Sequence, residues 1–83
     1  GRVVFAGTDE SYGNLLEIDH GSGLVTRYGH NSRLVVRQGQ IVEKGDIIAY
    51  VGSSGRVTTG PHLHFEVQKD GRTVDPRRYL PRY

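Results

Sequence analysis

The 83-residue chain contains no cysteine, no methionine and no tryptophan, and these absences exclude several ways of stabilising a small protein. Without cysteine the chain can form neither a disulfide framework nor a thiolate metal site. Only 35% of the residues are hydrophobic, so a large apolar interior is excluded as well. Small folds that lack such cross-links commonly depend on a bound metal, a partner or oligomerisation. We therefore expect one small domain over residues 1–83, of marginal stability.

Long hydrophobic runs and a strong excess of one charge are also missing. No apolar run approaches the roughly 18 residues of a membrane-spanning helix, and no basic-then-apolar leader opens the chain. The formal net charge is only +2. The basic excess is confined to residues 69–83. The sequence shows neither a broad basic face nor aromatic residues interleaved with one. The sequence therefore does not predict binding to nucleic acid.

Short β-branched and aromatic runs are separated by glycine-rich polar turns at intervals of about 8–12 residues. No stretch has the period of a helix. This pattern predicts an all-β fold, a mostly antiparallel sheet of sandwich or barrel type. Pro76 and Pro81 discourage further pairing, so we expect a packed or frayed tail. The predicted strands are residues 3–6, 15–19, 24–28, 34–37, 47–51, 62–67 and 72–74.

Alternation along the predicted strand 62–67 places His62, His64 and Glu66 on one face and apolar residues on the other. The two imidazoles lie about 7 Å apart along such a strand, and neutral imidazole is a common zinc ligand. Two solvated histidines on a half-exposed strand would give the same spacing. The apolar opposite face specifies the register that exposes both together. Glu66 suits a ligand or a general base by its chemistry, but we favour the role of a cross-strand charge partner.

The two remaining histidines differ in what surrounds them. If the strand over 24–28 continues, His30 joins the face of Thr26 and Tyr28 and opens a turn that can present a side chain to a cleft. His20 enters a tight turn with no tie to the other three, and we expect it to be structural. The glycine-rich loop 52–55 has neither a nucleophile elbow nor the lysine and helix of a phosphate cradle, which disfavours nucleotide binding.

The segment Gly60-Pro61-His62-Leu63-His64-Phe65-Glu66-Val67, with loop 52–55 before it and Val74-Asp75-Pro76 after it, resembles the C-terminal signature of the lysostaphin-type (LytM-like) zinc endopeptidases of peptidase family M23. Residues 12–21 and 26–30 resemble the strands leading to that family's first catalytic histidine, and residues 36–42 resemble the segment after it. The resemblance covers nearly the whole chain. It implies a mostly antiparallel β domain that cuts peptide stems or bridges of peptidoglycan in the bacterial cell envelope.

The resemblance also implies roles for three histidines. In the family, zinc is held by an H-x-x-x-D motif and by the second histidine of H-x-H, so His64 would be the metal ligand. His30 and His62 would be the catalytic pair, acting on the attacking water and on the oxyanion or the leaving amine. No H-x-x-x-D occurs in this chain. Since that motif precedes these strands in the family, we expect a zinc endopeptidase as the parent protein and an incomplete site in the 83-residue piece.

Two alternatives remain open at this point. A non-catalytic LytM-like domain that regulates cell-wall hydrolases by binding them would share the fold, and an upstream H-x-x-x-D would favour the enzyme over it. Retention of His30, His62 and His64 together favours the enzyme. A biotinyl- or lipoyl-carrier domain is more remote, because Lys44 and Lys69, the only lysines, lie outside the usual carrier setting.

The missing N-terminal segment predicts that the chain is an oligomer or a remnant still held by its other half. Chains that lose strands from a sheet expose unpaired backbone edges, which invite dimerisation or strand exchange. A monomer in light scattering at micromolar concentration would contradict this expectation.

Overall fold

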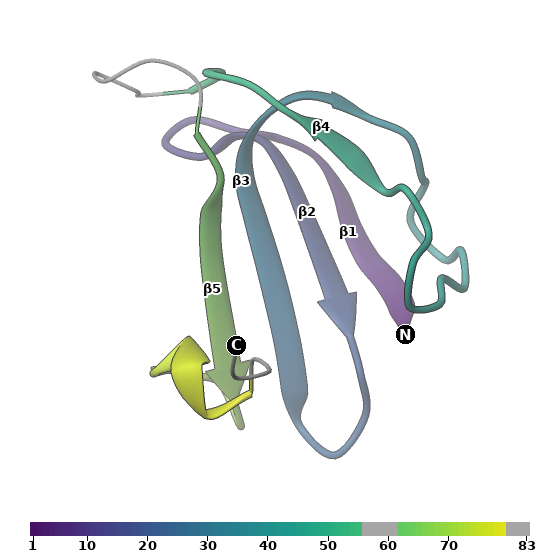
Figure 1. The fold of residues 1–83 in the computed structure, drawn as a ribbon, viewed down its shortest axis with the longest axis vertical. Helices are drawn as coiled ribbons and strands as arrows, with labels where there is room; N and C mark the ends of the chain where they lie inside the picture. The colour runs from purple at the N-terminus through teal and green to yellow at the C-terminus, as the bar shows by residue number, and fades with distance from the viewer. Residues whose placement is uncertain (56–61, 80–83) are drawn as a thin grey trace.

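Six strands form one antiparallel sheet in the part of the chain that the computed structural model describes, residues 1–55 and 62–79 (Figure 1). The elements are β1 (Arg2–Asp9), β2 (Gly13–Asp19), β3 (Leu24–Leu34), β4 (Ala49–Val51), β5 (His64–Lys69), β6 (Arg72–Val74) and a short 3-10 helix η1 (Pro76–Arg78). The predicted all-β, antiparallel fold is confirmed. No helix in these residues is long and apolar enough to cross a membrane.

The longest strand, β3, is at the centre of the sheet. The strand order is β1-β2-β3-β5-β6, and β4 also pairs with β3. One edge of β3 pairs with β2. The opposite edge is shared, because Leu24–Gly29 pairs with β5 and Asn31–Leu34 pairs with β4. An isolated bridge between Gly52 and His62 links the ends of β4 and β5.

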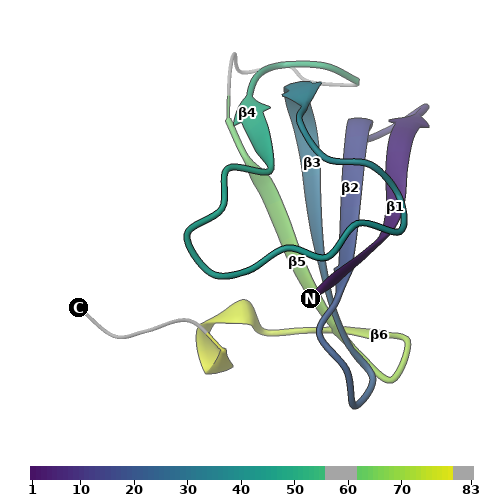
Figure 2. The ribbon, with the colours of Figure 1, turned by 90° about the vertical axis from the view of Figure 1, so that its right-hand side faces the viewer.

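The hydrophobic core lies on one face of the sheet, under the loop that joins β3 to β4. Val3, Leu16 and Ile18 of β1 and β2 are at most 3% exposed. Val36 and Val42 of the loop pack onto them. Figure 2 shows this loop and the C-terminal segment projecting from the same side of the sheet. The loop therefore acts as the second layer that covers the apolar face.

The predicted strand 34–37 is wrong beyond its first residue. β3 ends at Leu34, and the following residues belong to the covering loop. Val36 is buried because it points down onto the sheet face, not because it lies in a ladder. The N–H of Val35 donates to the carbonyl of Ile48 (2.9 Å), which closes the loop at its base. Apolar residues in this segment thus reflect packing of a loop on a sheet.

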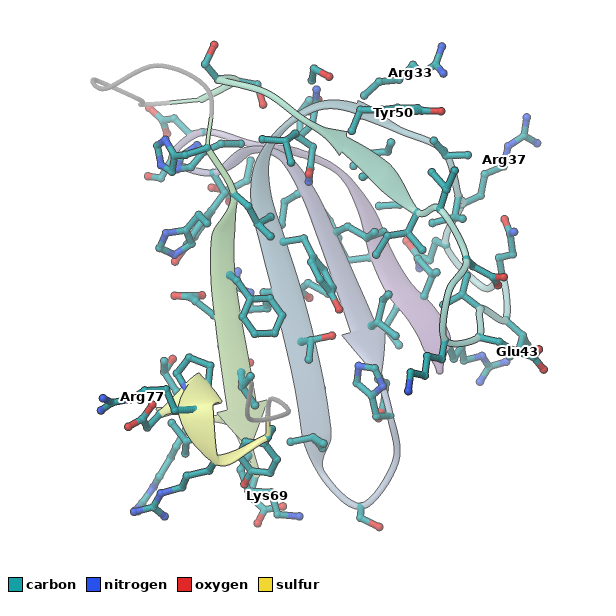
Figure 3. The ribbon with its side chains drawn as sticks, in the orientation of Figure 1. Arg33, Arg37, Glu43, Tyr50, Lys69 and Arg77 are labelled. Atoms are coloured by element: carbon teal, nitrogen blue, oxygen red, sulfur yellow. The ribbon has the colours of Figure 1, made fainter. Side chains whose placement is uncertain are left out.

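The C-terminal segment lies on the same side of the sheet as the loop (Figure 2). Tyr79 borders a cavity with Tyr28, Phe65 and Val67 of β3 and β5. Asp75 caps η1, because its carboxylate accepts a hydrogen bond from the backbone N–H of Arg77 (3.0 Å). Arg77 is labelled in Figure 3. Arg77, Arg78 and Tyr79 are exposed, so whether the tail is packed or frayed stays a prediction, and Pro81 lies outside the described residues.

One edge of the sheet is partly paired by the chain itself. At β1, the N–H and the C=O of Val3 bond to Gln40 and Gly39 of the covering loop. On the neighbouring strands β3 and β4, the guanidinium of Arg33 lies 5.0 Å from the centre of the Tyr50 ring, and Figure 3 labels both side chains. The chain therefore pairs the first part of the β1 edge itself, and dimerisation through the remaining edges stays a prediction.

Candidate active site

A β-bulge in β3 sets the position of His30. Asn14 pairs with Asn31 and Leu16 pairs with Tyr28, so three steps along β3 match two steps along β2. His30 is the residue with a positive φ, +63°, inside this extra step. A bulge of this kind bends the strand and re-aims a side chain.

The bulge places the His30 ring on the face opposite to the one that simple alternation predicts. Thr26 and Tyr28 pair with the apolar residues of β5, whereas His64 pairs with Gly29. The His30 ring lies 5.7 Å from the His64 ring, between ring centres. The prediction that His30 shares the face of Thr26 and Tyr28 is therefore wrong, because the extra residue reverses the alternation.

The three histidines singled out in the sequence come together on this face. The His30 ring centre is 5.2 Å from that of His62 and 5.7 Å from that of His64. His62 lies just before β5 and not in it, and its N–H donates to the carbonyl of Gly52 (3.0 Å). His30 is buried, at 7% exposure, while His62 is exposed. A group at the surface could thus reach one imidazole directly and the other at the base of the cluster.

His20 stands apart from this cluster. Its Nε2 lies 2.7 Å from the hydroxyl of Thr26, which in turn donates to the Tyr28 hydroxyl (2.9 Å) on the core face. Burial, and secondarily the nearby N-terminal ammonium, lowers the pKa of His20. These contacts agree with the structural role expected for this residue.

The backbone carbonyl of Ser54 fixes the tautomer of His30. His30 Nδ1 lies 2.7 Å from this oxygen. A carbonyl oxygen can only accept, so Nδ1 carries the proton and Nε2 keeps its lone pair. Hydrogen bonds of this kind orient an imidazole and define which nitrogen is available for chemistry.

Loop 52–55 is held in place by a close contact between two glycine backbones. A Cβ atom on Gly13 would lie 2.4 Å from the carbonyl carbon of Ser54, and one on Gly55 would lie 2.4 Å from the nitrogen of Gly13. Both glycines also have positive φ. The contact lets the Ser54 hydroxyl accept from the N–H of Asn14 (3.0 Å) and donate to the carbonyl of Asn31 (2.5 Å). The serine therefore anchors the loop to both strands beside His30.

A row of charges crosses the same face beneath the histidines. Arg27 lies directly opposite Glu17 of β2 and Glu66 of β5. Its Nε is 2.7 Å from Glu17 Oε2, and its Nη1 is 3.1 Å from Glu66 Oε2. Burial alone would lower the pKa of Arg27, but the two carboxylates outweigh burial and raise it. The predicted cross-strand charge partnership of Glu66 is confirmed.

Tyr12 lies beside the imidazoles, although the sequence did not single it out as a candidate site residue. Its ring centre is 5.2 Å from that of His64 and 6.4 Å from that of His30. The ring occupies the space over Gly29, where a Cβ atom would approach a Tyr12 ring carbon to 3.0 Å. Burial, followed by the charge of Glu66, raises the pKa of Tyr12. No local pattern signals this residue, because its hydroxyl bonds to Glu66, 54 positions away.

The described residues do not make a complete zinc site. They contain no group of three histidine, cysteine, aspartate or glutamate side chains that could hold a metal ion. Among the residues that the structure describes, the buried Nε2 of His64 has no hydrogen-bond partner, and the neighbouring carboxylate of Glu66 already bonds to Arg27 and Tyr12. The donor set on this face therefore fits at most one ligand of the set implied by the family resemblance.

The antiparallel sheet of this chain, with three imidazoles at one end of its charged face, has the fold of known peptidases. The structure matches that of a zinc-containing peptidase from Vibrio cholerae with a TM-score of 0.85 and 45% identity, covering 90% of this chain and 23% of that one. The particular family follows from the sequence. The model of peptidase family M23 matches residues 1–76, and the chain belongs to this family.

Two curated relatives show how the family is used elsewhere. The chain is 49% identical to a lipoprotein NlpD/LppB homolog of Pseudomonas aeruginosa, over 99% of this chain and 27% of that protein. It is 45% identical to the murein hydrolase activator NlpD of Escherichia coli, over 98% of this chain and 21% of that protein. The chain thus spans about a quarter of the length of these relatives. Membership of M23 leaves the carrier-domain alternative without support.

Proposed function

We propose that the protein carrying this chain hydrolyses peptide bonds in peptidoglycan in the bacterial cell envelope. In this proposal His30 and His62 are the catalytic pair and His64 is one metal ligand. The observation that carries the proposal is the bulge at His30. A left-handed backbone costs about 1–2 kcal/mol for a residue other than glycine. Glycine would avoid this cost, so the histidine is explained by what its ring does beside His62 and His64.

The geometry gives each imidazole of the pair a different task. His30 is buried and holds its Nε2 lone pair ready, so it suits the abstraction of a proton from an attacking water. His62 is exposed at the rim and suits proton donation to the leaving amine or contact with the oxyanion. The amide bond that this pair would cleave lies in the peptide stems or bridges of peptidoglycan.

Release of dye from labelled peptidoglycan by the full-length protein tests the proposal. We expect His30→Gln and His62→Gln each to lower the rate about 10²–10⁴-fold, the usual contribution of general acid or base catalysis. His20→Gln is the matched control, since His20 is outside the cluster, and it should keep the activity. Equal losses in all three variants, or no loss in the first two, would refute the assigned roles.

Zinc titration by calorimetry tests the role of His64. We expect weak binding by the 83-residue chain and tight binding by a version extended N-terminally by about 50 residues, if the extension supplies H-x-x-x-D. His64→Ala should abolish the tight binding. Tight binding by the short chain alone would show a metal site of another composition.

A second candidate is a non-catalytic role as an activator of other cell-wall hydrolases. Its support is the 45% identity to a murein hydrolase activator. This candidate predicts no dye release by the full-length protein alone, but faster release when it is mixed with a separate peptidoglycan hydrolase. Substitution of His30 or His62 by glutamine would then leave the stimulation unchanged.

A further inference from the structure

The surroundings of the Nε2 atom of His64 determine whether this atom carries a proton. This atom is buried and has no hydrogen-bond partner among the described residues. Its nearest charged neighbour is Oε1 of Glu66, 3.4 Å away. In a neutral imidazole each nitrogen is either a donor or an acceptor. The choice at Nε2 therefore also decides the state of Nδ1.

The Glu66 carboxylate is itself firmly placed. Its Oε1 accepts from the Tyr12 hydroxyl (3.1 Å) and its Oε2 accepts from Nη1 of Arg27 (3.1 Å). The guanidinium of Arg27 also lies 4.8 Å from the centre of the Tyr12 ring. The Glu66 side chain is only 17% exposed. Tyr12 and Arg27 thus hold an acceptor-only group against one nitrogen of His64.

Only one of the two neutral tautomers of His64 suits this neighbour. If Nδ1 carried the proton, the lone pair of Nε2 would face a carboxylate oxygen, and two acceptors would oppose each other in a buried place. If Nε2 carries the proton, it points a donor at the carboxylate. A distance of 3.4 Å is long for a hydrogen bond, as is usual for site contacts that tighten when the site is occupied.

We infer that Glu66 is a positioning residue for His64, and that its carboxylate holds this imidazole as the Nε2–H tautomer with the lone pair on Nδ1. His30 is held in the opposite tautomer by the Ser54 carbonyl. The two neighbouring rings therefore offer different nitrogens, Nε2 of His30 and Nδ1 of His64. This inference deepens the proposed function, because Nδ1 would be the atom of His64 left free to hold a metal. Only the metal-binding role of His64 rests on the proposed function, and the assignment of the tautomer does not.

Nitrogen-15 NMR of the histidine rings tests the inference on the chain without any metal. Spectra are recorded well above the ordinary imidazole pKa of about 6.5, where the protonated and unprotonated nitrogens have widely separated shifts. We expect His64 to show protonated Nε2 and unprotonated Nδ1, and His30 to show the reverse. A protonated Nδ1 on His64 in the unaltered chain would overturn the inference, and this reading needs no variant.

Three variants separate positioning from general stability. Glu66→Ala removes the acceptor, so both His64 nitrogens should shift toward the averaged values of a solvated imidazole. Glu66→Gln keeps the shape but has only one acceptor oxygen, which the donor-only Arg27 takes, so its NH2 group faces His64 and should favour the Nδ1–H tautomer. Glu17→Gln is the matched control, because Glu17 pairs with Arg27 from the other side, and it should leave His64 unchanged. A His64 spectrum that does not respond to Glu66→Ala would refute the positioning role.

The two proposals fail in different ways. If the full-length protein releases no dye while His64 is the Nε2–H tautomer, the hydrolytic function fails and the tautomer assignment stands. If dye is released but His64 is protonated at Nδ1, the positioning role of Glu66 fails and the function stands.

Discussion

Gly13 is the residue whose substitution should most clearly separate the cost of backbone strain from the cost of displacing loop 52–55. Gly13 and Gly21 both have positive φ, +69° and +89°. A Cβ atom on Gly21 would meet nothing within 4 Å, whereas one on Gly13 would lie 2.4 Å from the carbonyl carbon of Ser54. Both alanine variants therefore carry the left-handed penalty of about 1–2 kcal/mol, and only Gly13→Ala must also move the loop.

The additional cost of Gly13→Ala follows from the contacts of Ser54. Its hydroxyl makes two hydrogen bonds, to Asn14 and Asn31, and each contributes about 0.5–1.5 kcal/mol. The extra destabilisation is thus about 1–3 kcal/mol. For a domain of this size, 1 kcal/mol corresponds to about 4–8 °C in Tm, so Gly13→Ala should melt roughly 5–20 °C below Gly21→Ala.

Circular dichroism melts of the two variants measure this difference directly. Nitrogen-15 NMR adds a second readout, because movement of Ser54 takes the acceptor away from His30 Nδ1 and should release its fixed tautomer. Gly21→Ala should leave the His30 spectrum unchanged. Equal melting temperatures for the two variants, or an unchanged His30 in Gly13→Ala, would refute the idea that the glycine contact seats the loop.

Three further predictions concern the core, one histidine and the helix cap. Leu16 is fully buried, so Leu16→Ala should lower the free energy of unfolding by about 2–5 kcal/mol in urea titrations, and a loss below 1 kcal/mol would show that the covering loop fills the space. Burial lowers the pKa of His20 in the folded chain, so below pH of about 6.5 the unfolded chain binds more protons than the folded chain does. The contribution of His20 to stability should therefore be full above that pH and fall as the pH drops below it. His20→Gln should flatten that decline, and an unaltered slope would assign it to other groups. Hydrogen bonds from Arg77 lower the pKa of Asp75 to about 2, so its stabilising contribution should persist to below pH 4 and vanish near pH 2. A carboxyl titration by NMR checks the Asp75 value, and Arg77→Ala should return it toward the ordinary one.

The faces of β5 could be predicted because its alternation is regular. His64 and Glu66 lie on the charged face with Arg27, while Phe65 and Val67 pair with the core-facing residues of β3. Apolar residues on one side and polar residues on the other fix such a register from sequence alone. The same reasoning correctly predicted that Glu66 is a cross-strand charge partner.

The sequence could not reveal the features that depend on distant segments or on the backbone. The placement of His30 needs one extra residue in β3, whereas the sequence predicted a turn at this point and not a bulge in a continuous strand. The acceptor for its Nδ1 is a carbonyl, a group that every residue has, so Ser54 could be found only from the fold. Tyr12 lies in a turn by its sequence, and only the pairing of β3 with β5 brings its ring to His64.

The bulge at His30 makes this face sensitive to the number of residues in β3 as well as to their type. Removal of one residue between Arg27 and Asn31 would restore regular alternation and turn a different side chain toward His64, with every strand still able to pair. The loop over 35–48, in contrast, can change length without shifting any register in the sheet. Among homologous chains, we expect insertions and deletions to accumulate in that loop and to be absent between Arg27 and Asn31, so that conserved spacing there would mark the site even where a histidine has been replaced.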